Sequence, residues 1–501
     1  MGRSVAQGQT TAGRARSVPH WLDLVPSVVI GGVLVGVALA AYWLPGSVRF
    51  YNHFVWQAMA FLGGSAAIPW PVPGNDYFQD VFPILDAYGA QTGFALLPFP
   101  PLPAIVLMPV VAIFGLATDH RAVSVVVGAI DVGLCWWALG RLPIRRPVRL
   151  AVTIFFGFGT VFWYAAELGT TWFFAHVVAV AFAFLAIGVA LGGDRSLEAD
   201  LSADEDVGVD GPAGAIGSGI DRLFNAALDA LAEVGDRLRN PGALIDRRQF
   251  AAGLLFGIAC TARLTIVFGA PFFVFVGSGG SAARRAVSAG LGALIPIGLL
   301  LAYNQATTGH LFHPGYEYLY QLEANGYAAL GYHPSWSIED IRYLPQNLGL
   351  MLFGTPAILP DQIPSGLGPG AHLCTDPGAV RGLFDVRCPL VLPRDVGMSI
   401  LLTSPAYLLA LPALRNAARS RLVAGAGLAV LAIALVNLMH FSQGWVQFGY
   451  RFSNDFVVFA LPLVALGVSR RGGIGMLATW LIGVSVAVNF WGMTWGNLLG
   501  W

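Results

Sequence analysis

The sequence predicts an all-α polytopic membrane protein. Hydrophobic residues make up 56% and charged residues only 11% of the 501-residue chain, and the mean hydropathy is +0.66. Windows of about 20 apolar residues, long enough to cross a hydrocarbon core of roughly 30 Å, recur from Val25 to the C-terminus. Because a chain in lipid must satisfy its backbone hydrogen bonds internally, we expect these windows to form one bundle of helices.

We predict a bundle of about 11 transmembrane helices. The apolar windows lie near residues 25–44, 122–140, 149–166, 172–192, 250–263, 264–279, 286–303, 397–414, 421–439, 455–469 and 473–495. Arg263 lies inside the apolar stretch 250–279 and therefore predicts a turn between two short spans.

The chain is accordingly divided into four parts. They are a cytoplasmic tail over residues 1–24, an N-terminal transmembrane module over 25–303, a large external loop over 304–396, and C-terminal transmembrane helices over 397–501. The N-terminal module contains an outer loop over 45–121 and a cytoplasmic insertion over 194–249, which ends in a stretch with apolar residues at helical spacing.

The arginines predict the orientation of these spans. With the N-terminus in the cytoplasm, twenty of the 28 basic residues fall in inside loops and eight fall outside, in agreement with the positive-inside rule. This count requires the apolar segment 98–121 to be a juxtamembrane or re-entrant helix on the outer side. Every basic residue is Arg, a bias typical of GC-rich bacterial genomes, so we expect a multi-pass protein of a bacterial plasma membrane. Net charge is zero, and no nucleic-acid partner is implied.

Ionisable residues gather at the outer boundaries of several spans. They occur in the stretches NDYFQD (75–80), WYAAELGTTWFFAH (163–176), TARLT (261–265) and QFGYRFSND (447–455). Carboxylates and arginines at one membrane surface can deprotonate a hydroxyl group and hold a phosphate. The candidate residues are Asp76, Asp80, Glu167, His176, Arg263, Tyr316 and Arg451, with His53 as an alternative base.

Each candidate also has a structural interpretation. Asp76 follows Pro-Gly and suits a turn, whereas Asp80 follows an aromatic pair outside any obvious turn. Arg451 and Asp455 are four residues apart and could form only an i,i+4 salt bridge, and His176 lies on an apolar helix, where a buried His is usual. The aromatic residues nearby suit an interfacial belt.

Cysteine spacing suggests one cross-link. Cys374 and Cys388 lie 14 positions apart in a polar outer loop, where an oxidising compartment favours a disulfide. Cys135 and Cys260 fall within spans and are expected to be packing residues. No zinc-ligand spacing or phosphate-binding Gly loop is present in a suitable context.

The order of these features resembles the GT-C fold glycosyltransferases, in particular the superfamily of protein O-mannosyltransferases and aminoarabinose transferases. The resemblance covers roughly residues 25–303. It rests on the stretches NHFVWQAMAFLGGSAAIP (52–69), PFPPLPA (98–104), AAELG (165–169) and GLLFGIACTARLT (253–265), with weaker similarity in YNQATTGHLFHPGYEY (303–318) and FGYRFSNDF (448–456).

The resemblance implies an inverting enzyme that transfers a sugar, of the mannose or pentose class, from a polyprenyl-phosphate donor to a hydroxyl group on the outer face. It assigns Asp80 or Asp76 as general base and Glu167 as a second acid that orients the acceptor or a metal. Arg263 and Arg451, with His176 and Tyr316, would bind the donor or its phosphate. The acceptor would be a lipid, a polysaccharide or a protein. No cofactor is required, and a divalent metal stays open but is not indicated.

The chain departs from the family pattern at one point. Many relatives carry an acid just before or within the first juxtamembrane helix, where this chain reads YNHFVWQAM (51–59). Either the base has moved to Asp80, or His53 replaces it, or the activity is lost. Two other functions therefore stay open, a transporter or flippase of a lipid-linked sugar and a catalytically silent assembly protein.

Overall fold

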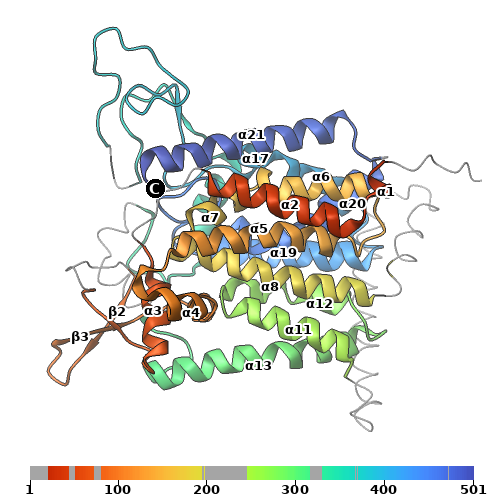
Figure 1. Cartoon of the computed structure of the whole chain (residues 1–501), viewed down its shortest axis with the longest axis horizontal. Helices are drawn as coiled ribbons and strands as arrows, with labels where there is room; N and C mark the ends of the chain where they lie inside the picture. The colour runs from red at the N-terminus through yellow and green to blue at the C-terminus, as the bar shows by residue number, and fades with distance from the viewer. Residues whose placement is uncertain are drawn as a thin grey trace, which may run out of the picture.

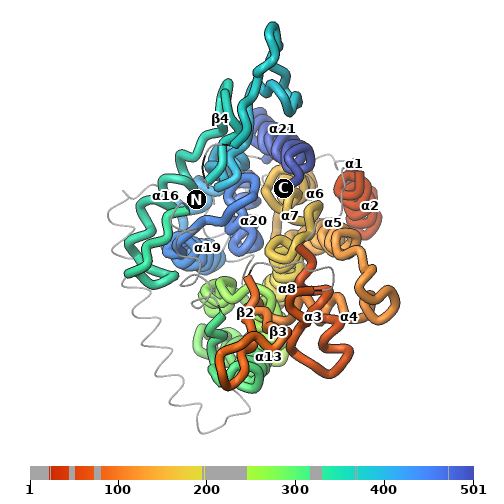
Figure 2. Tube along the Cα trace, turned by 90° about the vertical axis from the view of Figure 1, so that its left-hand side faces the viewer, coloured from red at the N-terminus to blue at the C-terminus, as the bar shows by residue number. Residues whose placement is uncertain are grey.

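The computed structural model describes residues 21–44, 51–72, 80–194, 197, 245–315, 330–366, 368, 370–471 and 473–501. Its helices run side by side in one bundle, with the strands β2 and β3 and the short helices α3 and α4 at one end (Figure 1). We call this the loop end of the bundle. Figure 2 looks onto the loop end and shows α3, α4, β2 and β3 beside the end of α8. The predicted insertion over 194–249 falls mostly outside the described residues.

The helices follow the apolar windows of the sequence. They are α1 (Trp21–Leu24), α2 (Ser27–Trp43), α3 (His53–Leu62), α4 (Leu102–Phe114), α5 (His120–Leu139), α6 (Arg146–Gly159), α7 (Phe162–Leu168), α8 (Thr171–Gly193), α11 (Arg247–Cys260), α12 (Pro271–Phe275), α13 (Ala282–Thr308), α16 (Leu344–Phe353), α17 (Ile400–Thr403), α18 (Leu411–Leu414), α19 (Arg421–Met439), α20 (Ser453–Arg470) and α21 (Met476–Leu499). Short 3-10 helices are η1 (Gly115–Ala117), η3 (Leu264–Gly269), η5 (Ile341–Tyr343) and η6 (Pro405–Ala410).

The chain has the helices of a membrane protein. In the described part of the chain, six helices are long and apolar enough to cross a membrane by length and composition, namely α5, α8, α13, α19, α20 and α21. A seventh span results if α6 and α7, which meet at a bend of 52°, are taken together. Shorter apolar helices include α2, α4 and the pair η3–α12. The count of about 11 spans thus stays a prediction.

Small residues bring the helices around the site into close contact. A Cβ atom at Gly253 or Gly257 of α11 would lie 2.0 Å or 2.5 Å from a backbone oxygen of α13. This spacing of four residues places both glycines on one face of α11, which lets the two backbones approach. Helix α11 then ends at Cys260, and Arg263 follows before η3 begins. The predicted break near Arg263 is present.

The loop end contains strands that the all-α prediction missed. Strand β3 (Gln91–Leu96) pairs antiparallel with β1 (Ile68–Pro69) and with β2 (Phe82–Leu85). The carboxylate of Asp86 accepts hydrogen bonds from the backbone N–H groups of Tyr88 and Ala90, which closes the turn between β2 and β3. The strands are short and β2 contains Pro83, so they lack the period-two pattern that marks a strand in sequence.

The segment 330–398 forms a second structured region at the loop end. Strands β4 (Ala357–Ile358) and β5 (Val391–Leu392) pair antiparallel, and Cys374 and Cys388 form a disulfide between them in sequence. Leu373 and Leu392 pack against Trp495 of α21, which attaches this region to the bundle. We call residues 357–396 the disulfide lobe.

Thiol labelling tests the disulfide lobe. Without reductant we expect no cysteine of the folded protein to react with a polar maleimide, because Cys374 and Cys388 are bonded and Cys135 and Cys260 are buried. Mild reduction of the folded protein should expose two thiols, unfolding without reductant should expose the other two, and unfolding with reductant should expose all four. Two reactive thiols before reduction would contradict the pairing.

Candidate functional site

A buried carboxylate organises the loop end of the bundle. Asp455 lies in the first turn of α20, and its side chain is fully buried. Arg263 donates from Nε to Oδ1 at 3.1 Å and from Nη2 to Oδ2 at 3.0 Å, a two-point contact that fixes the plane of the guanidinium group. Nδ1 of His176 on α8 lies 2.8 Å from Oδ1. Oδ2 also accepts hydrogen bonds from the Thr265 hydroxyl at 2.7 Å and the Asn437 amide at 3.2 Å.

These contacts decide the role of Asp455. A carboxylate offers about four lone-pair positions, and this one accepts four hydrogen bonds, with the His176 ring nitrogen as a further close contact at 2.8 Å. Asp455 therefore has no capacity to take a proton from a substrate. It instead holds Arg263 and His176 in fixed positions.

Two guanidinium groups meet at one aromatic ring. The guanidinium carbon of Arg263 lies 5.6 Å from the ring centroid of Phe452, and that of Arg451 lies 5.1 Å from it. The rings of His176 and His440 lie 6.4 Å and 6.1 Å from the same ring. The spacing of Arg451 and Asp455 offered an i,i+4 salt bridge as one interpretation; Asp455 pairs with Arg263, 192 positions away in sequence. We call Arg263, Arg451, His176, Phe452 and Asp455 the cationic cluster.

The first turn of α8 connects this cluster to Asp80. Trp172 donates from its indole nitrogen to Oδ2 of Asp80 at 2.9 Å. Trp172 and His176 are four residues apart on α8, so they lie on one face about 6 Å apart along the axis. Phe173, between them in sequence, lies 5.8 Å from the guanidinium of Arg451. His176, Arg263 and Arg451 thus meet around Phe452 and Asp455, and Asp80 is linked to them through one turn of α8.

Asp80 itself has an unusual backbone. Its φ angle is +56°, a left-handed conformation that Asp tolerates better than most residues. The side chain lies near Tyr51, whose pKa is raised by burial and further by the negative charge of Asp80. A half-buried carboxylate next to an aromatic ring and an indole N–H group results.

His53, the alternative base, packs near the same two aromatic residues, with its ring centroid 6.1 Å from that of Tyr51 and 5.9 Å from that of Trp172. It is fully buried at the first position of α3, and its Nδ1 lies 2.8 Å from the hydroxyl of Thr171. That hydroxyl also contacts the carbonyl of Tyr51 at 3.1 Å and accepts from the backbone N–H of His53. His53 therefore ties α3 to the start of α8.

Glu167 lies in a different group. It is 1% exposed on α7 and pairs with Nη2 of Arg121 at 3.1 Å. Arg121 also donates to the carbonyl oxygens of Tyr42 and Trp43 at the end of α2, and the amide of Asn497 on α21 contacts the other Glu167 oxygen at 3.3 Å. Glu167 thus links the ends of four helices.

Some expected residues cannot be placed and others were missed. Asp76 and Tyr316 lie outside the described residues. Sequence reasoning singled out neither Thr265 nor Asn437, which are unremarkable in sequence and acquire a role only through the fold. Within the described ranges, no group of three or more His, Cys, Asp or Glu side chains is placed to hold a metal ion.

Comparison with known proteins gives structural matches of low similarity. No protein-family model matches the sequence, and no curated protein matches it. Two solved structures that match are crystal structures of the Archaeoglobus fulgidus oligosaccharyltransferase. The apo form is 11% identical, with a TM-score of 0.36 over 96% of this chain and 56% of that chain. The form tethered by a disulfide to an acceptor peptide containing the NVT sequon is 12% identical, with a TM-score of 0.34 over 94% and 54%. This chain thus spans a little over half the length of that enzyme.

The buried pairing of Asp455 can be tested through stability. Asp455→Ala leaves Arg263 without its two-point partner, and we expect the free energy of unfolding to fall by about 3 kcal/mol. Asp361→Ala is the matched control, because its partner Arg381 lies at 3.0 Å but the Asp361 side chain is 89% exposed; the expected loss is below about 1 kcal/mol. Denaturant unfolding in detergent micelles measures both. Equal losses in the two variants would contradict the buried role of Asp455.

The pKa of Tyr51 reports on the position of Asp80. Asp80→Asn removes a negative charge beside the phenol, so the raised pKa of Tyr51 should fall toward, without reaching, its usual value of about 10, since burial persists. Because the pKa of Tyr51 is higher in the folded than in the unfolded protein, its contribution to the free energy of unfolding is present below about pH 10. This contribution is lost as the pH rises through the pKa of the folded state. The pKa of Tyr51 is measured from the rise of phenolate absorbance with pH, after subtraction of the same titration curve recorded for Tyr51→Phe. Asp86→Asn, in the same loop, should leave the pKa unchanged.

Proposed function

We propose that this chain is a GT-C-type glycosyltransferase that moves a sugar of the mannose or pentose class from a polyprenyl-phosphate donor to a hydroxyl acceptor. The reaction would take place at the outer face of a bacterial plasma membrane. The observation that carries the proposal is that the guanidinium groups of Arg263 and Arg451 both lie near the ring of Phe452. His176, which lies beside this ring, is one turn of α8 away from Trp172, the hydrogen-bond donor to Asp80.

The cationic cluster suits the phosphate of the donor. Its two guanidinium groups and one carboxylate give a net positive charge when His176 is neutral. Arg is always charged and binds phosphate oxygens through paired N–H groups, and the contact with Asp455 orients Arg263 before any ligand arrives. Such preorganised charge stabilises a phosphate that gains negative charge as it leaves.

The reaction assigned to the site is a single displacement. Asp80 takes the proton of the acceptor hydroxyl as the oxygen attacks the anomeric carbon of the sugar. The bond from that carbon to the phosphate oxygen breaks, and the polyprenyl phosphate departs with the bonding electrons toward Arg263 and Arg451. The configuration at the anomeric carbon is inverted. The Trp172 indole orients the carboxylate of Asp80 by its hydrogen bond.

Glu167 is assigned a supporting role in this proposal. Its buried pairing with Arg121 and its contact with Asn497 join α2, α5, α7 and α21 at the loop end. A carboxylate that is 1% exposed and already paired is a poor ligand for an acceptor. Its charge instead holds Arg121 against the carbonyl groups that end α2.

Asp80→Asn tests the reaction directly. The purified protein in lipid nanodiscs is supplied with synthetic polyprenyl-phosphate mannose or polyprenyl-phosphate arabinose and a cell-envelope extract as acceptor. We expect the rate of sugar transfer to fall by about 10²–10⁴-fold with normal expression, because the amide cannot accept a proton. Asp86→Asn is the matched control, since its side-chain oxygen can still accept the turn hydrogen bonds.

The outcomes separate the alternatives. Near-normal transfer by Asp80→Asn would remove Asp80 from the mechanism and leave His53 or Asp76 as base. Absence of transfer by the unmodified protein, together with movement of the intact donor across a vesicle membrane, would favour a transporter of lipid-linked sugar. Absence of both would favour an assembly protein.

A further inference from the structure

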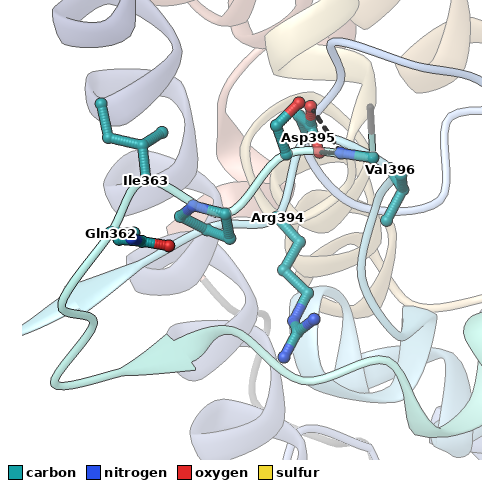
Figure 3. Close-up of a pocket in the computed structure, with 8 residues that line it drawn as sticks. Gln362, Ile363, Arg394, Asp395 and Val396 are labelled. Carbon is teal, nitrogen blue, oxygen red and sulfur yellow. Dashed lines mark hydrogen bonds between the residues drawn. The ribbon is translucent and has the colours of Figure 1, made fainter. Parts of the chain in front are cut away.

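The disulfide lobe contains a pocket that the proposed chemistry does not use. It measures about 370 Å³ and is formed by one segment that follows β4 and one that follows β5. Its lining residues are Gln362, Ile363, Pro364, Ser365, Gly366, Arg394, Asp395 and Val396. Figure 3 shows Gln362 and Arg394 on the two segments, with Asp395 turned away from both, toward its hydrogen-bond partners.

The walls of this pocket are held in place by the lobe itself. The pairing of β4 with β5 fixes the separation of the two segments. The carboxylate of Asp395, 6% exposed, accepts the backbone N–H of Gly366 at 2.9 Å and the indole N–H of Trp445 at 2.8 Å. Nε of Arg394 donates to the carbonyl of Thr355 at 3.0 Å, which orients its guanidinium group. The pocket is therefore largely preformed.

The chemistry of the walls favours an uncharged polyol. Arg394 and Asp395 contribute one charge of each sign to the residues that line the pocket, so the lining carries no net charge, in contrast to the cationic cluster. The Nη groups of Arg394 and the amide oxygen of Gln362 can hydrogen-bond hydroxyl groups, while Arg394 Nε is held by Thr355 and the Gln362 amide nitrogen by the ring of His372. Ile363, Pro364 and Val396 supply an apolar surface of the kind that packs on the C–H groups of a sugar ring.

Buried hydrogen bonds link the pocket to the cationic cluster. The backbone N–H of Gln447 donates to the carbonyl of Asp395, and its side-chain amide donates to the carbonyls of Val396 and Gln443. The Gln443 amide donates to the carbonyl of Asn437 at 3.0 Å. Asn437 in turn donates to Asp455, which holds Arg263. The pocket and the proposed phosphate site are thus parts of one connected framework.

We propose that this pocket binds one uncharged sugar ring of the acceptor, so that the acceptor is a glycan. The inference rests on the proposed function and specifies its acceptor. The framework through Gln447 and Asn437 would keep this ring at a fixed position relative to the donor phosphate. A second hydroxyl group of the same glycan would then reach the reacting centre.

Binding without any donor tests this inference apart from the transfer reaction. Saturation-transfer NMR on the full-length protein in nanodiscs would use methyl α-mannoside, methyl α-arabinofuranoside and methyl α-glucoside as neutral probes, with glucuronate and inorganic phosphate as anionic ones. We expect at least one neutral glycoside to bind, and Arg394→Ala or Gln362→Ala to weaken its binding about tenfold or more. Arg387→Ala removes an exposed Arg of the same lobe outside the pocket and should bind normally.

The results distinguish failure of the pocket from failure of the enzyme. Binding that is equal in the unmodified protein and in both pocket variants, or a preference for glucuronate or phosphate, would overturn the inference. So would the absence of binding by every neutral glycoside. Thermal unfolding midpoints equal to that of Arg387→Ala establish that the pocket variants are folded. Specific glycoside binding with no sugar transfer would reject the proposed function and keep the sugar pocket.

Discussion

The contact between Asp455 and Arg263 joins segments that otherwise have no reason to lie together. Arg263 follows the break after α11, Asp455 begins α20, and the same carboxylate reaches His176 on α8 and Asn437 on α19. A charged pair in such a buried place is costly unless its hydrogen bonds are complete. Four hydrogen bonds to one carboxylate meet that condition, so a single side chain sets the register of four helices at the loop end.

The first turn of α8 translates this constraint into the geometry of the site. The Thr171 hydroxyl contacts His53 of α3, and the Trp172 indole donates a hydrogen bond to Asp80. The Phe173 ring lies near the guanidinium group of Arg451, and the His176 ring lies next to the carboxylate of Asp455. Successive residues of a helix point in different directions, so a single turn can contact several elements at once. The largely buried helix α8 thereby positions side chains, such as Asp80 and Arg451, that come from segments outside the helices. The two carboxylates differ because their surroundings differ. Asp455 is fully buried among hydrogen-bond donors and orients Arg263, whereas Asp80 is half-buried beside the Trp172 indole.

The sequence predicted the parts of the molecule that local pattern controls. Apolar windows and Arg263 within one of them indicated the helices and the break after α11, and the polar boundaries indicated which residues gather at the loop end. Contacts between residues that are far apart in sequence leave no comparable local pattern. Arg451 and Asp455 stand at helical spacing, yet Asp455 pairs with a residue 192 positions away, and Glu167 contacts Asn497 at a separation of 330. The strands β2 and β3 were missed because Pro83 and their short length hide the alternation of a strand.

The saturation of Asp455 has a consequence for any chemistry at this end of the bundle. A base needs a lone pair that points at the substrate, and the most buried acid of the cluster has none to offer. The half-buried acid nearby is Asp80, which accepts a hydrogen bond from an indole that cannot itself take or give a proton in the physiological range. Burial near Tyr51 and Trp172 limits hydration of this carboxylate while leaving it at the boundary between helices and loops. In the proposed reaction, the phosphate of a membrane-bound donor and the hydroxyl group of an acceptor meet at this boundary.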